Sequence, residues 1–136
     1  MADNVLLSVN RLELWFAERF QGLRTWHSNE VVAYVTGVFG NRRLAQNDLS
    51  TASVTLAYES ARAKRDFAEL QRVGDWVLWV EAMCPDSLGH NHDIVENFGR
   101  LSYYACHDIM RGQWHVYAEL ANDLPVIAKH VQHHLV

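Results

Sequence analysis

The stretch from Leu70 to Leu88, Leu-Gln-Arg-Val-Gly-Asp-Trp-Val-Leu-Trp-Val-Glu-Ala-Met-Cys-Pro-Asp-Ser-Leu, contains the most apolar run of the chain. Residues 76–84 are apolar apart from Glu81, and a helix that is apolar nearly all round belongs in a core. Pro85 ends this helix, because the residue before a proline avoids helical backbone angles. The stretch therefore predicts a short central helix around which the other helices pack.

Gly74 and Asp75 precede the apolar run and combine a helix stop with a helix start. Glycine after a helix readily takes the left-handed conformation, and aspartate accepts hydrogen bonds from the first free N–H groups of the next helix. We therefore predict a hinge between two helices at this pair. The residues expected to define the architecture are Gly74, Asp75, Trp76, Trp79 and Pro85.

Helical spacing of apolar residues continues on both sides of the central helix, and no window alternates strictly enough for a strand. Clustered β-branched residues make 31–36 the one stretch where a strand competes with a helix. The other expected helices cover about 4–20, ended by Gly22; 28–40, with an exposed end at 41–43; Asp48 or Ser50 to about Val73; 93–110; 114–122; and a last one starting at Asp123 and Pro125. We predict an all-α single domain over residues 1–136, a bundle of about six or seven short helices around the central helix 76–84.

Two stripes are expected on the helix at 93–110. Apolar residues at helical spacing predict its inner stripe: Ile94, Phe98, Leu101, Ala105 and Ile109. The opposite stripe mixes charge with an aromatic ring, as partner surfaces do: Glu96, Arg100, Tyr103 and His107. A solvated face and a weak partner surface both explain this second stripe.

Composition narrows the class of protein. The 136 residues are 49% hydrophobic and 21% charged, which is ordinary for a globular domain with one core. The formal charge of −4 and the isoelectric point of about 6.0 do not favour nucleic acid as a partner. The N-terminus lacks the features of a signal peptide and no apolar run is long enough for a membrane span, so we expect a cytoplasmic protein with Cys84 and Cys106 as reduced thiols.

Seven of the eight histidines follow Val73, so this part of the chain becomes less negative as they protonate near pH 6. The His90-Asn91-His92 turn and the His107-Asp108 doublet raise the hypothesis of a metal-dependent hydrolase. The helical wheel argues against it, because Asp108 is expected to face inward and His107 outward. No metal site or other cofactor is therefore predicted, and these four residues remain the weak candidates.

Two further hypotheses concern the core. Glu81 is the best single candidate for acid–base chemistry, because burial would raise the pKa of its carboxyl group. One solvated position on an amphipathic helix is the simpler explanation. The five tryptophans could line a pocket for haem or another flat small molecule, although aromatic residues at helical spacing more commonly form the core. The sequence contains no nucleophile elbow and no glycine-rich phosphate loop.

Five short motifs follow one another from Leu70 onward: Leu70 with Gly74-Asp75 and Leu78, Pro85-Asp86-Ser87-Leu88, Gly99 with Tyr103, Glu119-Leu120-Ala121, and Leu124-Pro125. In these motifs the second half of the chain resembles a family of short bacterial helical proteins of unknown function. The sequence departs from that pattern at 82–84, where glycine and aromatic residues are expected. The resemblance implies a cytoplasmic bacterial helical protein and carries over no catalytic residues.

Since no reactive constellation is evident, we predict a non-enzymatic protein that acts through protein contacts, as a small regulator, an adaptor or a homo-oligomer. The first alternative is the metal-dependent hydrolase that would use His90, His92, His107 and Asp108. The second alternative is a carrier of haem or another small molecule.

Overall fold

The computed structural model describes residues 14–40 and 49–135. Residues 14–19 are helical, and the elements that follow are η1 (Phe20–Thr25), α2 (Asn29–Gly40), α3 (Val54–Lys64), α4 (Phe67–Met83), η3 (Pro85–Asn91), α5 (His92–Ile109) and α6 (Val116–Leu135). The two described ranges contain no strand, and the all-α bundle is confirmed. The start of the first expected helix, at 4–13, and the exposed end expected at 41–43 lie outside the described residues.

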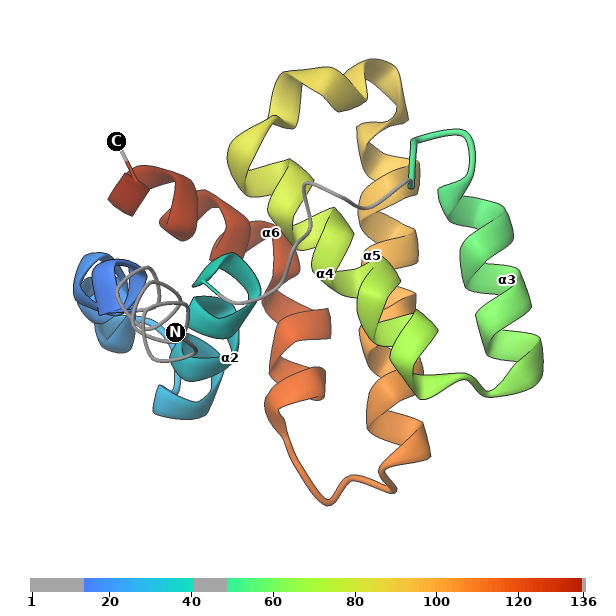
Figure 1. The fold of residues 1–136 in the computed structure, drawn as a ribbon, viewed down its shortest axis with the longest axis horizontal. Coiled ribbons are helices and arrows are strands. Elements are labelled where there is room, and N and C mark those ends of the chain that lie inside the picture. Colours follow the sequence, from blue (N-terminus) through green and yellow to red (C-terminus); the bar gives the residue numbers. More distant parts are fainter. Residues whose placement is uncertain (1–13, 41–48, 136) are drawn as a thin grey trace, which may run out of the picture.

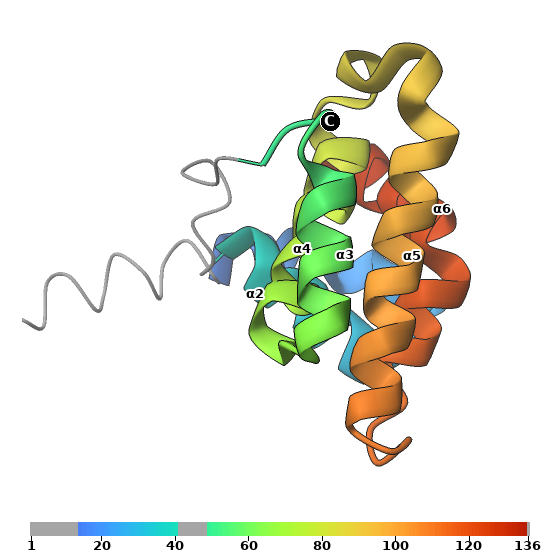
Figure 2. The same ribbon diagram turned by 90° about the vertical axis from the view of Figure 1, so that its right-hand side faces the viewer.

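Helices α4, α5 and α6 form the centre of the bundle, and each packs on the other two (Figure 1). Helix α3 covers α4 and α5 on one side, whereas α2 and η1 pack on the opposite side, against α6. Figure 2 shows α4, α5 and α6 running side by side, with η3 above them as the connection from α4 to α5. Among the described helices, none combines the length and the apolar character that a membrane span requires.

The hinge predicted at Gly74-Asp75 is wrong, because both residues lie inside the continuous helix α4. The chain breaks nine residues before Gly74, where Arg65 takes a left-handed conformation with φ of 51°. Asp66 then caps α4, since its side chain accepts a hydrogen bond of 3.2 Å from the backbone N–H of Glu69. The expected central helix 76–84 is thus the second half of a longer rod, buried over most of its length but with Met83 46% exposed.

Replacing Asp66 with alanine should lower the free energy of unfolding by about 1 kcal/mol, because the first turn of α4 loses its side-chain acceptor. Asp66→Asn keeps an acceptor oxygen and should cost much less. Urea unfolding monitored by circular dichroism measures both values. Equal losses in the two variants would contradict the capping role.

Gly74 and Asp75 have a packing role in place of the hinge. A Cβ atom at Gly74 would lie 2.6 Å from Cε1 of Tyr103, so only glycine lets this ring lie against α4. Asp75 is 1% exposed and accepts hydrogen bonds from the hydroxyl groups of Tyr34, at 2.6 Å, and Tyr103, at 2.8 Å. The pair therefore joins α2, α4 and α5 in the core, which is a contact that no local helix signal could reveal.

Helix α5 begins and ends within one residue of the predicted range, but only Phe98, Ala105 and Ile109 of its predicted inner stripe pack against the core. Ile94 is 58% exposed and Leu101 is 36% exposed. The buried residues of α5 are Val95, Gly99, Ser102, Tyr103 and Cys106. A Cβ atom at Gly99 would lie 2.6 Å from Cγ1 of Val77, so close packing of α5 on α4 selects small side chains for the interface. A hydrophobicity pattern misses such a face.

The last two expected helices are one helix, α6, with Pro125 in its interior. Proline has no N–H group to donate to the carbonyl oxygen four residues before it, which belongs to Ala121. That oxygen accepts a hydrogen bond of 2.8 Å from Nε of Arg100 on α5. A neighbouring helix thus supplies the donor that the proline lacks, and the helix continues.

The N-terminal elements agree with the sequence in part. Gly22 does not end the first helical segment, because η1 continues through it to Thr25. Ser28 caps α2 as expected, since its Oγ accepts a hydrogen bond of 3.2 Å from the backbone N–H of Val31. Residues 31–36 are helical, so the competing strand does not form.

Candidate metal centre

The four candidate metal ligands from the sequence do not converge. His90 ends η3 and His92 begins α5, whereas His107 and Asp108 lie at the other end of α5. At a rise of about 1.5 Å per residue, His92 and His107 are separated by roughly 22 Å along the helix. The predicted orientations are also reversed, because Asp108 is exposed and His107 is half-buried, with its ring centroid 6.3 Å from that of His115.

The predicted partner stripe is also divided. Tyr103 is 0% exposed and belongs to the core, so it cannot be part of a surface. Glu96, Arg100 and His107 are half-buried. The stripe as a whole is therefore not a binding face, although Glu96 and Arg100 still lie at the surface.

The tryptophans are spread over the molecule. Trp76 is 7% exposed and Trp79 packs against the core, in agreement with their expected structural role. Trp15, Trp26 and Trp114 are 43%, 66% and 38% exposed. This distribution counts against a shared tryptophan-lined pocket for haem.

One histidine of the candidate set takes part in a different cluster. Glu81 on α4 and His92 and Glu96 on α5 offer ligand atoms that all lie within 4.8 Å of one another. The turn through Pro85 and Gly89, where φ is 53°, reverses the chain and brings the end of α4 beside the start of α5. His92 and Glu96 are four residues apart, so they occupy the same face of α5.

Glu81 is the buried member of this cluster. Its side chain is 3% exposed, compared with 42% for His92, and its Oε1 lies 3.6 Å from Nε2 of His92. This Oε1 atom has no hydrogen-bond partner among the described residues. Because a buried carboxylate oxygen without a partner costs free energy, its presence here calls for an explanation.

Electrostatics make Glu81 unusual as well. Burial raises the pKa of its carboxyl group to about 8, and the charge of Glu96 and a hydrogen bond with Glu96 contribute further. The carboxyl group of Glu81, beside that of Glu96, therefore largely keeps its proton at neutral pH. A divalent cation between them would replace that proton and stabilise both charges.

The donor set suits a divalent transition metal. Two carboxylates and one imidazole are ligands that zinc, manganese and iron(II) accept in proteins, and helical bundles bind metals with the same residue types. Metal–ligand bonds of about 2.0–2.2 Å bring ligand atoms to about 3–3.5 Å from one another, so only small side-chain movements are needed. Nδ1 of His92 lies 3.5 Å from a carboxylate oxygen of Asp93, an arrangement that can orient a ligating imidazole.

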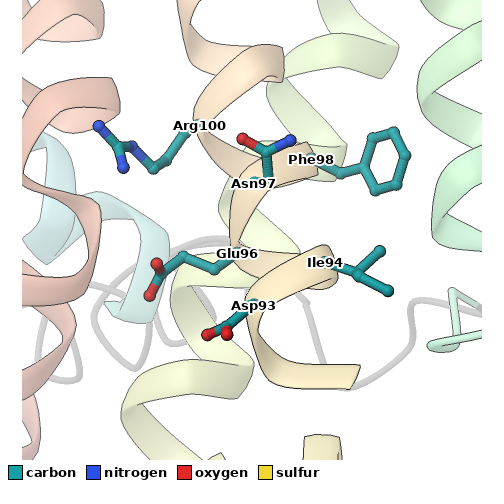
Figure 3. A pocket seen from close by; sticks show the side chains of 6 residues that line it. All are labelled: Asp93, Ile94, Glu96, Asn97, Phe98 and Arg100. Atoms are coloured by element: carbon teal, nitrogen blue, oxygen red, sulfur yellow. The ribbon is translucent and has the colours of Figure 1, made fainter. Parts of the chain in front are cut away.

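An open pocket of about 450 Å³ borders this cluster (Figure 3). Its lining comes entirely from α5 and consists of Asp93, Ile94, Glu96, Asn97, Phe98 and Arg100. Figure 3 shows Glu96 and Arg100 extending to one side of α5, with Ile94 and Phe98 on the other side. Glu96 is therefore the member of the cluster that a small ligand in this pocket can contact, whereas Glu81 is buried.

A second histidine pair joins the N-terminal region to α6. Nε2 of His27 lies 2.9 Å from Nδ1 of His130, and Ser28 donates a hydrogen bond of 2.8 Å to Glu119 beside them. Burial lowers the pKa of His27, and the charge of His130 lowers it further, whereas Asp123 and Glu119 oppose the shift. The folded protein therefore favours the neutral form of the His27 imidazole.

Stability should fall as the pH decreases below about 6.5, the ordinary histidine pKa, because the unfolded chain then binds a proton that folded His27 resists. Denaturant unfolding at several pH values between 5 and 7.5 measures this slope. His27→Gln should show a shallower slope, with His115→Gln as the control variant. An unchanged slope in His27→Gln would show that other groups cause the acid sensitivity.

Sequence reasoning identified parts of this centre in separate places. Glu81 appeared as an acid–base candidate, His92 as a metal ligand and Glu96 as a surface residue. The spacing of His92 and Glu96 was readable as one helical face, but the approach of Glu81 depends on the turn at 85–91. No protein-family model, curated protein or solved structure shows significant similarity to the chain, and the resemblance carried by 70–125 stays a prediction.

Proposed function

We propose that this protein binds a divalent transition-metal ion through Glu81, His92 and Glu96. The observation that carries the proposal is the buried Oε1 of Glu81, which has no hydrogen-bond partner among the described residues and faces the imidazole of His92. An acidic pair alone would not be enough, but an unpartnered buried ligand atom and a histidine at the same point support a cation site.

Three protein ligands leave coordination positions open, as in catalytic rather than structural metal sites. A bound ion would supply Lewis-acid chemistry, polarising an oxygen of a ligand or lowering the pKa of a bound water. Glu81 and Glu96 would hold the ion, and His92 would complete the set on its solvent side. The proposal keeps the metal-dependent alternative from the sequence but changes its residues, since only His92 is retained.

Metal-stripped, untagged protein should bind one Mn²⁺ or Zn²⁺ ion per chain in isothermal titration calorimetry. At a free metal concentration of 100 times Kd, binding should stabilise the fold by about 2.7 kcal/mol, which a thermal melt detects as a higher Tm. Glu81→Gln should weaken binding by more than about 100-fold, because removing a ligand costs more than removing a residue that orients one.

Two comparisons make this test specific. Glu59→Gln on the exposed face of α3 removes a carboxylate elsewhere and should leave binding unchanged. Glu81→Gln also lacks the buried ionisable group, so it should become progressively more stable than the natural chain as the pH rises from about 4.5 through 8. Metal binding that survives in Glu81→Gln would place the ion at other histidines, such as those at 130–134, and would refute the proposed centre.

A second candidate function is action through protein contacts, with a second copy of this chain as the partner. Ile94, Phe98 and Leu101 form a stripe on α5, and the exposed fractions of Ile94 and Leu101 are 58% and 36%. This spacing matches a helix–helix interface. We propose that in this case the protein is a cytoplasmic homo-oligomer that does not bind nucleic acid. Light scattering after size exclusion should detect a dimer that Ile94→Glu converts to a monomer; a monomer at all concentrations would contradict it.

A further inference from the structure

Arg100 extends the proposed metal centre by one helical turn. His92, Glu96 and Arg100 are successive residues at intervals of four, so they form one stripe along α5, with neighbouring Cβ atoms about 5–6 Å apart. Figure 3 shows the Glu96 and Arg100 side chains on the same side of the helix, and both line the pocket of about 450 Å³. A cationic side chain thus lies next to a ligand of the proposed ion, on its open side.

The guanidinium group of Arg100 is held in place by the irregularity of α6. Its Nε donates to the carbonyl oxygen of Ala121, which Pro125 leaves without a donor of its own. Among the described residues, no carboxylate forms an ion pair with Arg100, and its Nη1 and Nη2 atoms have no hydrogen-bond partner. The N–H groups of these two atoms therefore remain available for a ligand, in a position that the Nε contact fixes.

We propose that the centre binds a phosphoryl group, which bridges the metal ion and Arg100. This inference rests on the proposed metal-binding function and names the class of ligand for the same site. One phosphate oxygen would occupy an open coordination position, and others would accept hydrogen bonds from Nη1 and Nη2. Arginine matches the geometry of a phosphate with two parallel donors, and metal and arginine together are a common combination at phosphoryl groups.

Charge makes the two binding events dependent on each other. Without a cation, the carboxylates of Glu96 and Asp93 repel an anion from this side of α5. A divalent ion cancels the charge of Glu81 and Glu96, and Arg100 then offsets the charge of Asp93, so an anion that contacts both the ion and Arg100 is no longer repelled. Phosphate should therefore bind the metal-loaded protein and not the metal-free protein.

Calorimetric titration of inorganic phosphate into Mn²⁺-loaded and metal-free protein tests this inference. We expect binding only with Mn²⁺, at least about 10-fold weaker binding in Arg100→Gln, and partial recovery in Arg100→Lys, which keeps the charge but not the two parallel donors. Arg62→Gln on exposed α3 is the matched loss of a positive charge and should change nothing. A second titration, with acetate in place of phosphate, tests whether the site distinguishes phosphate from a carboxylate.

The outcomes separate the two proposals. If neither Mn²⁺ nor Zn²⁺ binds, both are overturned. If Mn²⁺ binds with the same affinity to the natural chain and Arg100→Gln, but phosphate does not bind or is indifferent to Arg100, only the phosphoryl inference is overturned. If acetate binds as tightly as phosphate, the site accepts carboxylates as well and the assignment to phosphoryl groups is wrong. Unchanged Mn²⁺ affinity in Arg100→Gln also shows that this variant is folded.

Discussion

Tyr103→Ala is expected to lower the free energy of unfolding by about 3–5 kcal/mol, the usual loss for a large aromatic side chain in a core. The ring is 0% exposed and packs against the bare backbone of Gly74, so its removal opens a cavity between α4 and α5. Asp75 would also lose the hydroxyl donor at 2.8 Å. Equilibrium urea unfolding, with the natural chain measured in parallel, gives this value.

Tyr103→Phe separates packing from hydrogen bonding. The ring stays in place, the hydroxyl contact with Asp75 is lost, and Tyr34 still donates to the same carboxylate oxygen. We expect a loss of about 1–2 kcal/mol in this variant, clearly smaller than in Tyr103→Ala. A loss below about 1 kcal/mol in Tyr103→Ala would place the ring outside the core and contradict the central packing of the bundle.

Gly99→Val is expected to have the second largest effect on stability, a loss of about 1–3 kcal/mol or more from overpacking. The first added carbon would lie 2.6 Å from Cγ1 and 2.7 Å from Cβ of Val77, and 3.1 Å from Cδ2 of Leu124. The Cβ atom of Val77 cannot move without its backbone, so α4 and α5 must separate. Thermal and urea unfolding both report the loss.

Gly37→Ala provides the matched control. Gly37 is also inside a helix, α2, but a Cβ atom there would meet nothing within 4 Å. Alanine is the better helix former, so this variant should gain about 0.5–1 kcal/mol. Gly99→Ala is the variant to compare with it, because both add a single methyl group. If the two variants changed the free energy of unfolding similarly, helix propensity, and not the contact with Val77, would decide the effect at Gly99.

The helix boundaries show what local signals can and cannot decide. Ser28, Pro85 and the start of α5 were readable, because capping and proline geometry act within a few residues. Gly74-Asp75 and Pro125 gave equally strong local signals and misled, since each has a distant partner. Tyr103 packs on Gly74, and Arg100 donates to the carbonyl oxygen that Pro125 leaves free.

The orientation of α5 shows the same distinction on a larger scale. Its sequence has a clear apolar stripe through Ile94 and Leu101, yet the buried residues include Gly99, which packs on α4, and Ser102. Close approach of two helices favours small residues, which a hydrophobicity scale does not rank as buried. An error of face in the prediction of α5 also assigned Tyr103 to the surface.

The candidate site depended on both levels. His92 and Glu96 share a face of α5 by spacing alone, and Glu81 was conspicuous as the one charged residue of an apolar helix. Their meeting required the reversal of the chain through η3 and the packing of α4 on α5. The four ligands suggested by sequence motifs do not form one site, because His92 begins α5 whereas His107 and Asp108 lie at the other end of the same helix.

The sequence by itself determined that the chain is an all-α bundle and that most of the apolar run from 76 to 82 is buried, because helical periodicity and the apolar run are properties of neighbouring residues. Only the tertiary structure decided that Gly74 and Asp75 lie within a helix, which face of α5 is inside, and which carboxylates meet His92. These outcomes depend on pairs of residues far apart in the chain, whose steric fit and hydrogen bonds arise only when α4, α5 and α6 are packed together.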